Sequence, residues 1–332
     1  MTTRTSTPGS TTTATPLLSV EGAGKRFHTP AGPLQALDDV DLQVHRGETL
    51  GLVGESGCGK STLARAVMGL LSLSQGCIRF DGADIAALPG PAQLAWRARL
   101  QMVFQDPFAS LNPRSRIGCI LEEPLIVHRR GTATQRRERV AAALQRVGLA
   151  PEMAQRHPHE FSGGQRQRVA IARALMLAPE LLVCDEAVSA LDVSVRAQVL
   201  NLLLALRAEQ GLAMLFISHD LSVVQHLADR VVVMYLGRVV EDAPREALWR
   251  APQHPYTRAL MAAVPALTPP TARAHSAAVP PLPLRGDLPS PLDAPAGCAF
   301  HPRCPQASAR CAIERPLLRT LDSGHRVACH LV

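Results

Sequence analysis

One stretch near the start of the chain limits its possible folds more than any other. Residues 51–62 read GLVGESGCGKST and contain the spacing G-x-x-x-x-G-K-S. The mostly apolar run before them, residues 48–53, has the length of a buried strand, and residues 62–70 after them read as a helix. A strand, a glycine-rich loop and a helix in this order predict an α/β fold with a phosphate-binding loop at the strand end.

The residue types in this loop suit phosphate oxygens. Glycines let the backbone turn tightly, so that its N–H groups converge on an anion, and the helix N-terminus adds partial positive charge. Lys60 can neutralise the β- and γ-phosphates, and the Ser61 hydroxyl can ligate Mg²⁺. An ordinary glycine turn is the alternative, but the chain keeps a lysine here although it has only two among its 35 basic residues. The predicted binding residues are Gly54, Glu55, Ser56, Gly57, Cys58, Gly59, Lys60, Ser61 and Thr62.

Length and composition allow one large α/β domain with a smaller appendage, because 332 residues with 46% hydrophobic content can bury a substantial core. No run approaches the roughly eighteen apolar residues of a membrane span. Residues 1–16 lack the apolar core of a signal peptide, so we expect a disordered tail and a cytosolic chain. The net charge of +7 admits nucleic acid or an anionic membrane as partners, but the basic run at 128–139 lacks interleaved aromatics and favours a solvated face instead.

Four polar side chains stand where predicted strands end. Gln105 follows the strand 100–104, Asp185 and Glu186 end an apolar strand, and His219 follows the strand 213–217. A carboxylate close to a phosphate loop can hold Mg²⁺, which we assign to Asp185, and its neighbour can accept a proton from an attacking water. Strand-end placement makes the histidine a candidate γ-phosphate contact, although a lone histidine is usually structural.

Two further features have weaker signals. Residues 117–177 read as helical, and within them Ser162-Gly163-Gly164 opens a helix, which offers a second cluster of free N–H groups or simply a capped helix start. Phe27, expected between two strands, is a semi-exposed aromatic that could stack on an adenine ring or fill a core or edge position.

The order of these motifs resembles the nucleotide-binding subunit of ABC transporters over about residues 17–250. Four segments are similar in sequence to the ATPase subunits of dipeptide and oligopeptide importers: GESGCGKST, FQDPFASLNPR, HPHEFSGGQRQR and QHPYTRALMAAVP. The resemblance implies an α/β ABC-type P-loop ATPase domain, with a helical subdomain at about 106–177 and a C-terminal extension at 251–332.

The resemblance also implies roles for individual residues. Two chains would pair head to tail around two ATP molecules, each site joining the phosphate loop of one chain to the signature of the other. The implied catalytic residues are Glu186, His219 and Gln105, and the implied Mg²⁺ ligands are Ser61, Gln105 and Asp185. Besides the phosphate loop, the implied ATP contacts are Phe27, Ser162, Gly163, Gly164, Gln165 and Asp192.

The partners that follow from the resemblance are a second ATPase subunit, two transmembrane permease subunits and, indirectly, a solute-binding protein. The permeases would dock near residues 105–116, and the chain would lie at the cytoplasmic face of the membrane. Nickel and glutathione remain alternative solutes. A non-transport ABC ATPase of DNA repair or translation is a less favoured alternative, because such chains normally carry two cassettes and only one is present here; nucleic acid is not expected as a partner.

One residue departs from the family pattern. The position after the catalytic glutamate is usually proline, whereas this chain has Ala187. The acids are intact, but the rigidity of Glu186, which a following proline would hold in the extended region, is in question.

The last eighty residues differ in composition. Residues 265–295 are rich in proline and alanine and predict an irregular linker. Four cysteines follow at intervals of six, seven and eighteen residues, a spacing that predicts a metal site and lacks the paired C-x₂-C of zinc ribbons. The resemblance implies a [4Fe–4S] cluster on Cys298, Cys304, Cys311 and Cys329, on a segment with too few apolar residues for its own core. The other cysteines read as small core or loop residues.

Overall fold

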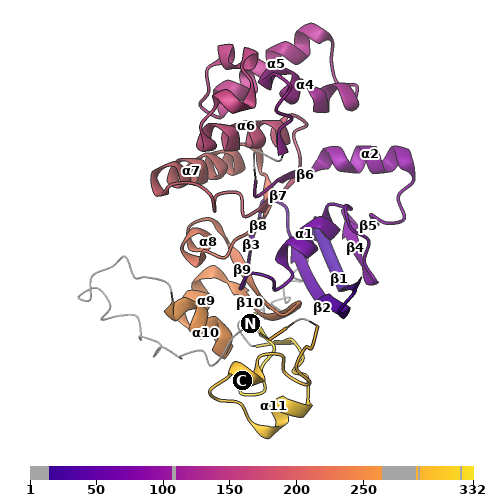
Figure 1. The fold of residues 1–332 in the computed structure, drawn as a ribbon, viewed down its shortest axis with the longest axis vertical. Helices are drawn as coiled ribbons and strands as arrows, with labels where there is room; N and C mark the ends of the chain where they lie inside the picture. Colours follow the sequence, from indigo (N-terminus) through magenta and orange to yellow (C-terminus); the bar gives the residue numbers. More distant parts are fainter. Residues whose placement is uncertain (1–14, 107–109, 264–288, 291, 322–323) are drawn as a thin grey trace, which may run out of the picture.

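The computed structural model describes residues 15–106, 110–263, 289–290, 292–321 and 324–332. Within these residues the main sheet has the strand order β11-β12-β10-β9-β3-β8-β7-β6 (Figure 1). Its five strands from β9 to β6 pair in parallel, and the strands on the β10 side pair antiparallel. The strands are β3 (Thr49–Val53), β6 (Leu100–Val103), β7 (Leu181–Asp185), β8 (Ala213–Ile217), β9 (Arg230–Tyr235), β10 (Arg238–Pro244), β11 (Arg319–Thr320) and β12 (Arg326–Val327).

A second, antiparallel sheet has the order β2-β1-β4-β5 and lies with helix α1 on the right of Figure 1. Its strands are β1 (Leu18–Thr29), β2 (Gly32–Val44), β4 (Gln75–Phe80) and β5 (Ala83–Asp84). The first two strands are longer than their sequence pattern predicts, because they pair as a hairpin through Thr29 and Gly32. Phe27 is therefore inside β1 rather than between strands, although its half-buried position agrees with the prediction.

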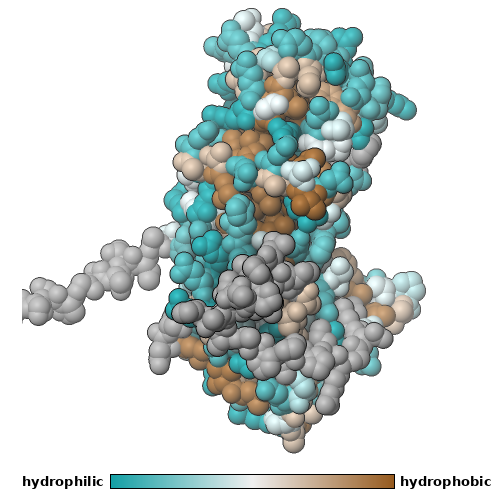
Figure 2. Space-filling view, turned by 90° about the vertical axis from the view of Figure 1, so that its left-hand side faces the viewer, coloured by the Kyte–Doolittle hydropathy of each residue, from teal (hydrophilic) through white to brown (hydrophobic). Residues whose placement is uncertain are grey.

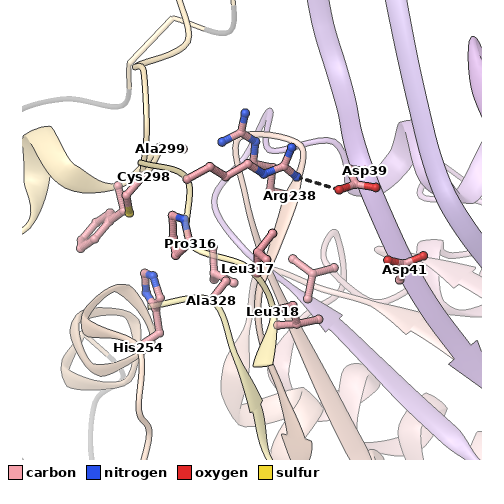
Figure 3. Close-up of a pocket in the computed structure, with 14 residues that line it drawn as sticks. Asp39, Asp41, Arg238, His254, Cys298, Ala299, Pro316, Leu317, Leu318 and Ala328 are labelled. Atoms are coloured by element: carbon pink, nitrogen blue, oxygen red, sulfur yellow. Dashed lines mark hydrogen bonds and ion pairs between the residues drawn. The ribbon is translucent and has the colours of Figure 1, made fainter. Parts of the chain in front are cut away.

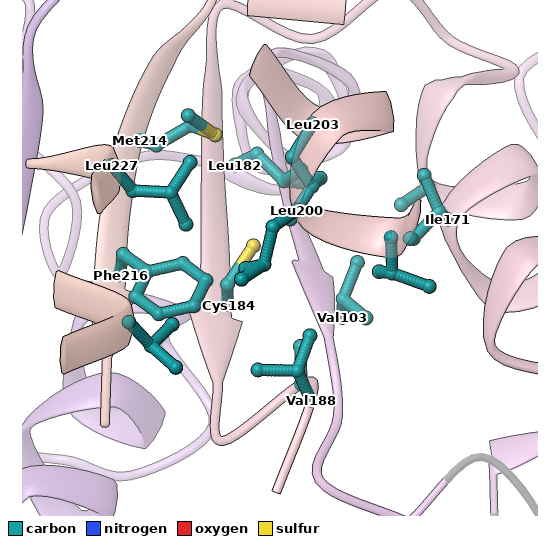
Figure 4. Close-up of a cluster of buried hydrophobic side chains, with 14 of the residues drawn as sticks. Val103, Ile171, Leu182, Cys184, Val188, Leu200, Leu203, Met214, Phe216 and Leu227 are labelled. Atoms are coloured by element: carbon teal, nitrogen blue, oxygen red, sulfur yellow. The ribbon is translucent and has the colours of Figure 1, made fainter. Parts of the chain in front are cut away.

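The main sheet is buried on both faces, which its uninterrupted apolar strands require. In β7, Leu181 and Val183 face the core shared with α1 and the second sheet, whereas Leu182 and Cys184 face the core shared with α6, α7 and α8. Figure 4 shows the second of these cores, where Cys184 and Phe216 lie among aliphatic side chains. Because β9, β3, β8, β7 and β6 pair in parallel, their carboxyl ends lie at one edge of the sheet.

The helical subdomain, at the top of Figure 1, contains α4, α5 and the start of α6, joined by two short 3₁₀ turns. The helices are α1 (Lys60–Val67), α2 (Gly90–Arg99), α4 (Ile117–Val127), α5 (Ala133–Arg146), α6 (Gly163–Leu175), α7 (Val193–Gln210), α8 (Leu221–Leu227), α9 (Arg245–Arg250), α10 (Pro255–Ala262) and α11 (Ala309–Ile313), and the 3₁₀ turns are η1 (Pro151–Gln155), η2 (Pro158–Glu160) and η4 (His301–Arg303).

The C-terminal extension is anchored to the main domain more firmly than its sequence suggests. Strand β12 pairs with β10 through Glu241 and Val327, so the extension lengthens the main sheet. The Phe300 ring is 1% exposed and belongs to the same core as Tyr235 of β9. Among its described residues the extension forms no hydrophobic cluster of its own; it instead inserts into the core of the main domain, which the sequence did not predict. That shared core continues past the boundary predicted at residue 250, and the tail at 1–14 and most of the linker lie outside the described residues.

Candidate nucleotide site

The phosphate loop connects β3 to α1, and its glycines are required by close backbone contacts. Gly54 has φ +153°, and a Cβ there would lie 2.2 Å from the Met234 carbonyl oxygen; a Cβ on Gly59, at φ +105°, would lie 2.4 Å from the Ala36 carbonyl oxygen. Side chains at these two positions would therefore collide with neighbouring backbone. The loop between them exposes Ser56 and Gly57, while Cys58 is buried beneath.

Lys60 is folded onto its own loop. Its side chain is buried, and Nζ donates hydrogen bonds to the carbonyl oxygens of Gly54 at 2.8 Å and of Glu55 at 2.9 Å. A buried ammonium needs such partners, and these keep it at the first turn of α1. The lysine is thus held at the place where the sequence predicts a phosphate contact.

Ser61 and Asp185 meet across the β7 strand end. The Ser61 hydroxyl donates to Oδ1 of Asp185 at 3.1 Å. Burial raises the pKa of the Asp185 carboxyl, and the nearby Glu186 charge acts in the same direction, whereas the Ser61 hydrogen bond lowers it. A hydroxyl and a buried carboxylate in contact are oxygen ligands that suit Mg²⁺, whose charge would stabilise the ionised carboxylate. The residues present therefore fit the predicted ion.

Three strand-end side chains meet, because Gln105 and His219 both contact the carboxylate of Glu186. Gln105 Nε2 donates to Oε2 of Glu186 at 2.9 Å, and His219 Nδ1 lies 3.2 Å from Oε1 of the same carboxylate. They follow β6, β7 and β8, which are neighbours in the parallel part of the sheet, so their carboxyl ends meet at one edge. The Glu186 side chain is 14% exposed and that of His219 is 52% exposed, so the group opens to solvent on the histidine side.

Glu186 itself has a backbone conformation that the sequence did not predict. Its φ is +48°, in the left-handed region rather than the extended one. Its N–H donates to the Ile217 carbonyl at 3.0 Å, and its own carbonyl accepts from the Ser189 N–H at 3.1 Å, which closes a turn with Ala187 at the second position. The turn, rather than a proline, aims the carboxylate at Gln105 and His219.

The signature segment lies elsewhere. Ser162 caps α6: its Oγ accepts from the Gln165 N–H at 3.3 Å, while Gln165 Oε1 accepts from the Ser162 N–H at 3.0 Å. In Figure 1 the start of α6 is apart from α1 and its phosphate loop, so this chain does not bring the two together in one site. Asp192, at the start of α7, is exposed. The Lys25 ammonium lies 5.3 Å from the centroid of the Phe27 ring.

Two residues that touch the phosphate loop were not predicted. Tyr256 of α10 accepts a hydrogen bond from the Glu55 N–H at 2.9 Å, and Arg303 of the extension pairs with the Glu55 carboxylate. Both lie in conspicuous stretches, QHPYTRAL and HPRC, but sequence position alone gives no sign that either folds back onto residue 55. Both lie beside an aromatic cluster in which Tyr256 packs on Tyr235, the last residue of β9, and on Phe300.

The four cysteines of the extension lie near one another. Burial raises the pKa of the Cys298 thiol to about 11, and the neighbouring thiols of Cys311, Cys329 and Cys304 add to that shift. The Leu331 N–H donates to the Cys329 sulfur at 3.5 Å, and the Ser308 hydroxyl lies 3.3 Å from the Cys311 sulfur. Four thiols with hydrogen bonds to sulfur are suitable donors for an iron–sulfur cluster.

The geometry of the same cysteines does not form a metal site. In the part of the chain that the structure describes, no three His, Cys, Asp or Glu side chains are arranged so that they could hold a metal ion. Cys298 instead lines a cavity of about 310 Å³ between the main domain and the extension, beside the ion pair of Arg315 with Asp39 at 3.3 Å (Figure 3). The iron–sulfur cluster therefore stays a prediction.

The chain matches two family models, and together they span most of the folded residues. Residues 37–189 match "ABC transporter", and residues 240–311 match "Oligopeptide/dipeptide transporter, C-terminal region". By fold it resembles a dimeric ATP-binding cassette, MJ0796, bound to ADP and Pi, with a TM-score of 0.63 and 28% identity over 69% of this chain and 98% of that one. The fold and the site therefore define an ABC-type ATPase.

The similar proteins narrow the class. The chain is 50% identical to the oligopeptide transport ATP-binding protein OppF of Escherichia coli, over 91% of this chain and 90% of that protein. It is 49% identical to the dipeptide transport ATP-binding protein DppF of Haemophilus influenzae, over 95% and 96% of the two chains. The chain belongs to the oligopeptide/dipeptide family of ABC transporter ATP-binding proteins. Among its described helices, none combines the length and the apolar character needed to cross a bilayer.

Proposed function

We propose that this chain hydrolyses ATP to ADP and phosphate and that this hydrolysis powers the import of dipeptides or oligopeptides. The observation that carries the proposal is the arrangement of Gln105 and His219 around Glu186, beside the Ser61–Asp185 pair. Such an arrangement can orient a water molecule for attack on the γ-phosphate. The sequence similarity to peptide-transport ATP-binding proteins supports the choice of solute.

The proposed mechanism assigns each group one task. Lys60 leaves its carbonyl partners to contact the β- and γ-phosphates, and Mg²⁺, held by Ser61, Asp185 and Gln105, would neutralise charge on the same oxygens. Glu186 accepts the proton of the attacking water as the bond from the water oxygen to the γ-phosphorus forms and the bond to the β-phosphate oxygen breaks. His219 contacts the γ-phosphate and, through its 3.2 Å contact, keeps the glutamate in place.

The proposal includes a dimer. Residues Ser162–Gln165 cannot reach the phosphate loop of their own chain, so they would complete the site of a second copy or a related subunit, with Asp192 at the contact. The similarity to a cassette described as dimeric supports this arrangement. Figure 2, which faces the side that carries α7 and α8, shows uncovered apolar side chains at mid-height. A cavity of about 520 Å³ beside His219 is lined by residues that include parts of α7, α8 and α10. A partner subunit would cover such a surface.

The remaining parts of the proposal concern the membrane. The chain would lie at the cytoplasmic face of the membrane, bound to two permease subunits that receive peptide from a solute-binding protein. Residues 105–116 would form the docking surface, of which 107–109 lie outside the described residues. Nickel or glutathione import would use the same ATPase chemistry.

Reconstitution tests the proposal directly. The chain would be copurified with its permease subunits in lipid vesicles, and ATP hydrolysis would be measured with and without a peptide-loaded solute-binding protein. We expect dipeptides or oligopeptides to raise the rate, and nickel or glutathione to leave it unchanged. Stimulation of ATP hydrolysis by nickel alone would show that nickel, rather than a peptide, is the transported solute. If the active ATPase copurified with no membrane subunit, the proposed transport function would be wrong.

A further inference from the structure

Glu55 is an acidic residue in a loop that is expected to bind an anion, and the structure holds each of its polar groups. Its N–H donates to the Tyr256 hydroxyl at 2.9 Å, and its carbonyl accepts from Lys60 Nζ at 2.9 Å. Its carboxylate accepts two hydrogen bonds from Arg303, at 2.7 Å and 3.0 Å. Two of these three partners lie more than 200 positions away along the chain, in α10 and in the extension.

Arg303 is well placed to act on this carboxylate. Its side chain is only 7% exposed, and its guanidinium carbon lies 5.9 Å from the centroid of the Tyr235 ring. Tyr235 and Tyr256 pack against each other and against Phe300, so the arginine lies against a cluster of aromatic rings. A two-point guanidinium–carboxylate pair with limited solvent access is stronger and more directional than a surface ion pair.

We propose that Arg303 is a positioning residue for ATP: it neutralises and holds Glu55, so that the loop presents its N–H groups and Lys60 to the phosphates. The physical reason is electrostatic. An unpaired carboxylate in the phosphate loop would repel the polyphosphate and would compete for Lys60, and the low exposure of the site weakens solvent screening. The inference rests on the proposed role of residues 54–62 as the ATP-binding loop, and it adds a residue of the C-terminal extension to the nucleotide site.

The test is a double-mutant cycle on the full-length chain, with KM and kcat for MgATP and direct ATP affinity as readouts. Arg303→Ala should raise KM about tenfold with little change in kcat, because it removes a charged hydrogen-bonded pair and leaves the carboxylate uncompensated. Adding Glu55→Ser should return KM most of the way, and Arg303→Lys should be intermediate. The matched control is Arg315→Ala, since Arg315 also joins the extension to the main domain but pairs with Asp38 and Asp39, away from the loop.

Salt gives a readout that a purely structural role would not move. The gap in ATP affinity between wild type and Arg303→Ala should narrow as ionic strength rises, because salt screens the freed carboxylate. If Arg303→Ala does not fold, Arg303→Lys with and without Glu55→Ser decides: a raised KM that Glu55→Ser lowers again supports the proposal, and an unchanged KM in Arg303→Lys contradicts it. Equal effects of Arg303→Ala and Arg315→Ala, or no rescue by Glu55→Ser, would also overturn it. Lys60→Ala separates the two assumptions, because retained ATP binding in that variant would refute the loop assignment itself.

Discussion

The nucleotide site and the C-terminal extension both lie beside the phosphate loop, but different kinds of contact hold them in place. The site is built from strand ends of one parallel sheet, so Gln105, Glu186 and His219 meet because β6, β7 and β8 are neighbours. The extension has little regular structure and is attached by single contacts: one short strand pairing, one buried ring and a few ion pairs. The repeated parallel strands thus position the catalytic side chains, whereas a few individual side chains attach the C-terminal extension.

The largest effect should come from the catalytic half of this comparison. Glu186→Gln keeps the shape of the side chain but cannot accept a proton, so we expect ATP hydrolysis to fall by about 10²–10⁴-fold while ATP still binds. ATP-bound dimers should accumulate, as size-exclusion chromatography would show. Glu209→Gln, on the exposed face of α7, is the control. Near-normal turnover in Glu186→Gln would show that another group accepts the proton.

The attachment of the extension should depend strongly on one ring. Phe300→Ala should lower the free energy of unfolding by about 3–5 kcal/mol, because the ring is buried against Tyr235, Tyr256 and His254. Chemical denaturation measures this change. Leu317→Ala, in the same extension but 71% exposed, should have almost no effect. A small effect of Phe300→Ala would mean that the extension is not part of the main core.

The cysteines test whether the extension also carries a metal. The four thiols are not arranged around a metal in the described residues, so a cluster would have to draw them together. We propose that it does, and that anaerobically purified protein is brown, with about four irons per chain and broad absorbance near roughly 400 nm. Cys311→Ser should bleach it and increase proteolysis after residue 295, whereas Cys119→Ser, at an exposed cysteine of α4, should not. Colourless protein with one zinc per chain would show that the cysteines bind zinc instead of an iron–sulfur cluster. Protein without any metal would contradict the metal site altogether.

The smallest predicted effect concerns the turn at the catalytic glutamate. Ala187 occupies the second position of a turn closed by the Ser189 N–H, a position that favours proline. Ala187→Pro should therefore stabilise the protein by about 0.4–1 kcal/mol and leave ATP affinity unchanged. Thermal unfolding measures the gain. A lower melting temperature would mean that the proline disfavours the left-handed backbone of Glu186 or that the buried site has no room for the ring.

Sequence reasoning succeeded where local patterns decide the structure. The apolar strands, the glycine loop and the polar strand ends each depend on a few adjacent residues, so their positions and even their meeting at one sheet edge could be predicted. It failed where contacts span the chain or where the backbone leaves the common regions. The Arg303–Glu55 pair has no local signal, and neither does the left-handed backbone of Glu186, which depends on a bond to Ile217 of another strand.

The separation between Glu55 and Arg303 also has a consequence for the order of events during synthesis. The ribosome produces the phosphate loop early, and Arg303 is the 248th residue added after Glu55. Because domains fold progressively from the N-terminus as they emerge, the cassette can assemble while the loop carboxylate is still unpaired. A chain interrupted anywhere before residue 303 would keep that charge beside its phosphate site. Tight binding of ATP would then mark nearly finished chains and distinguish them from fragments.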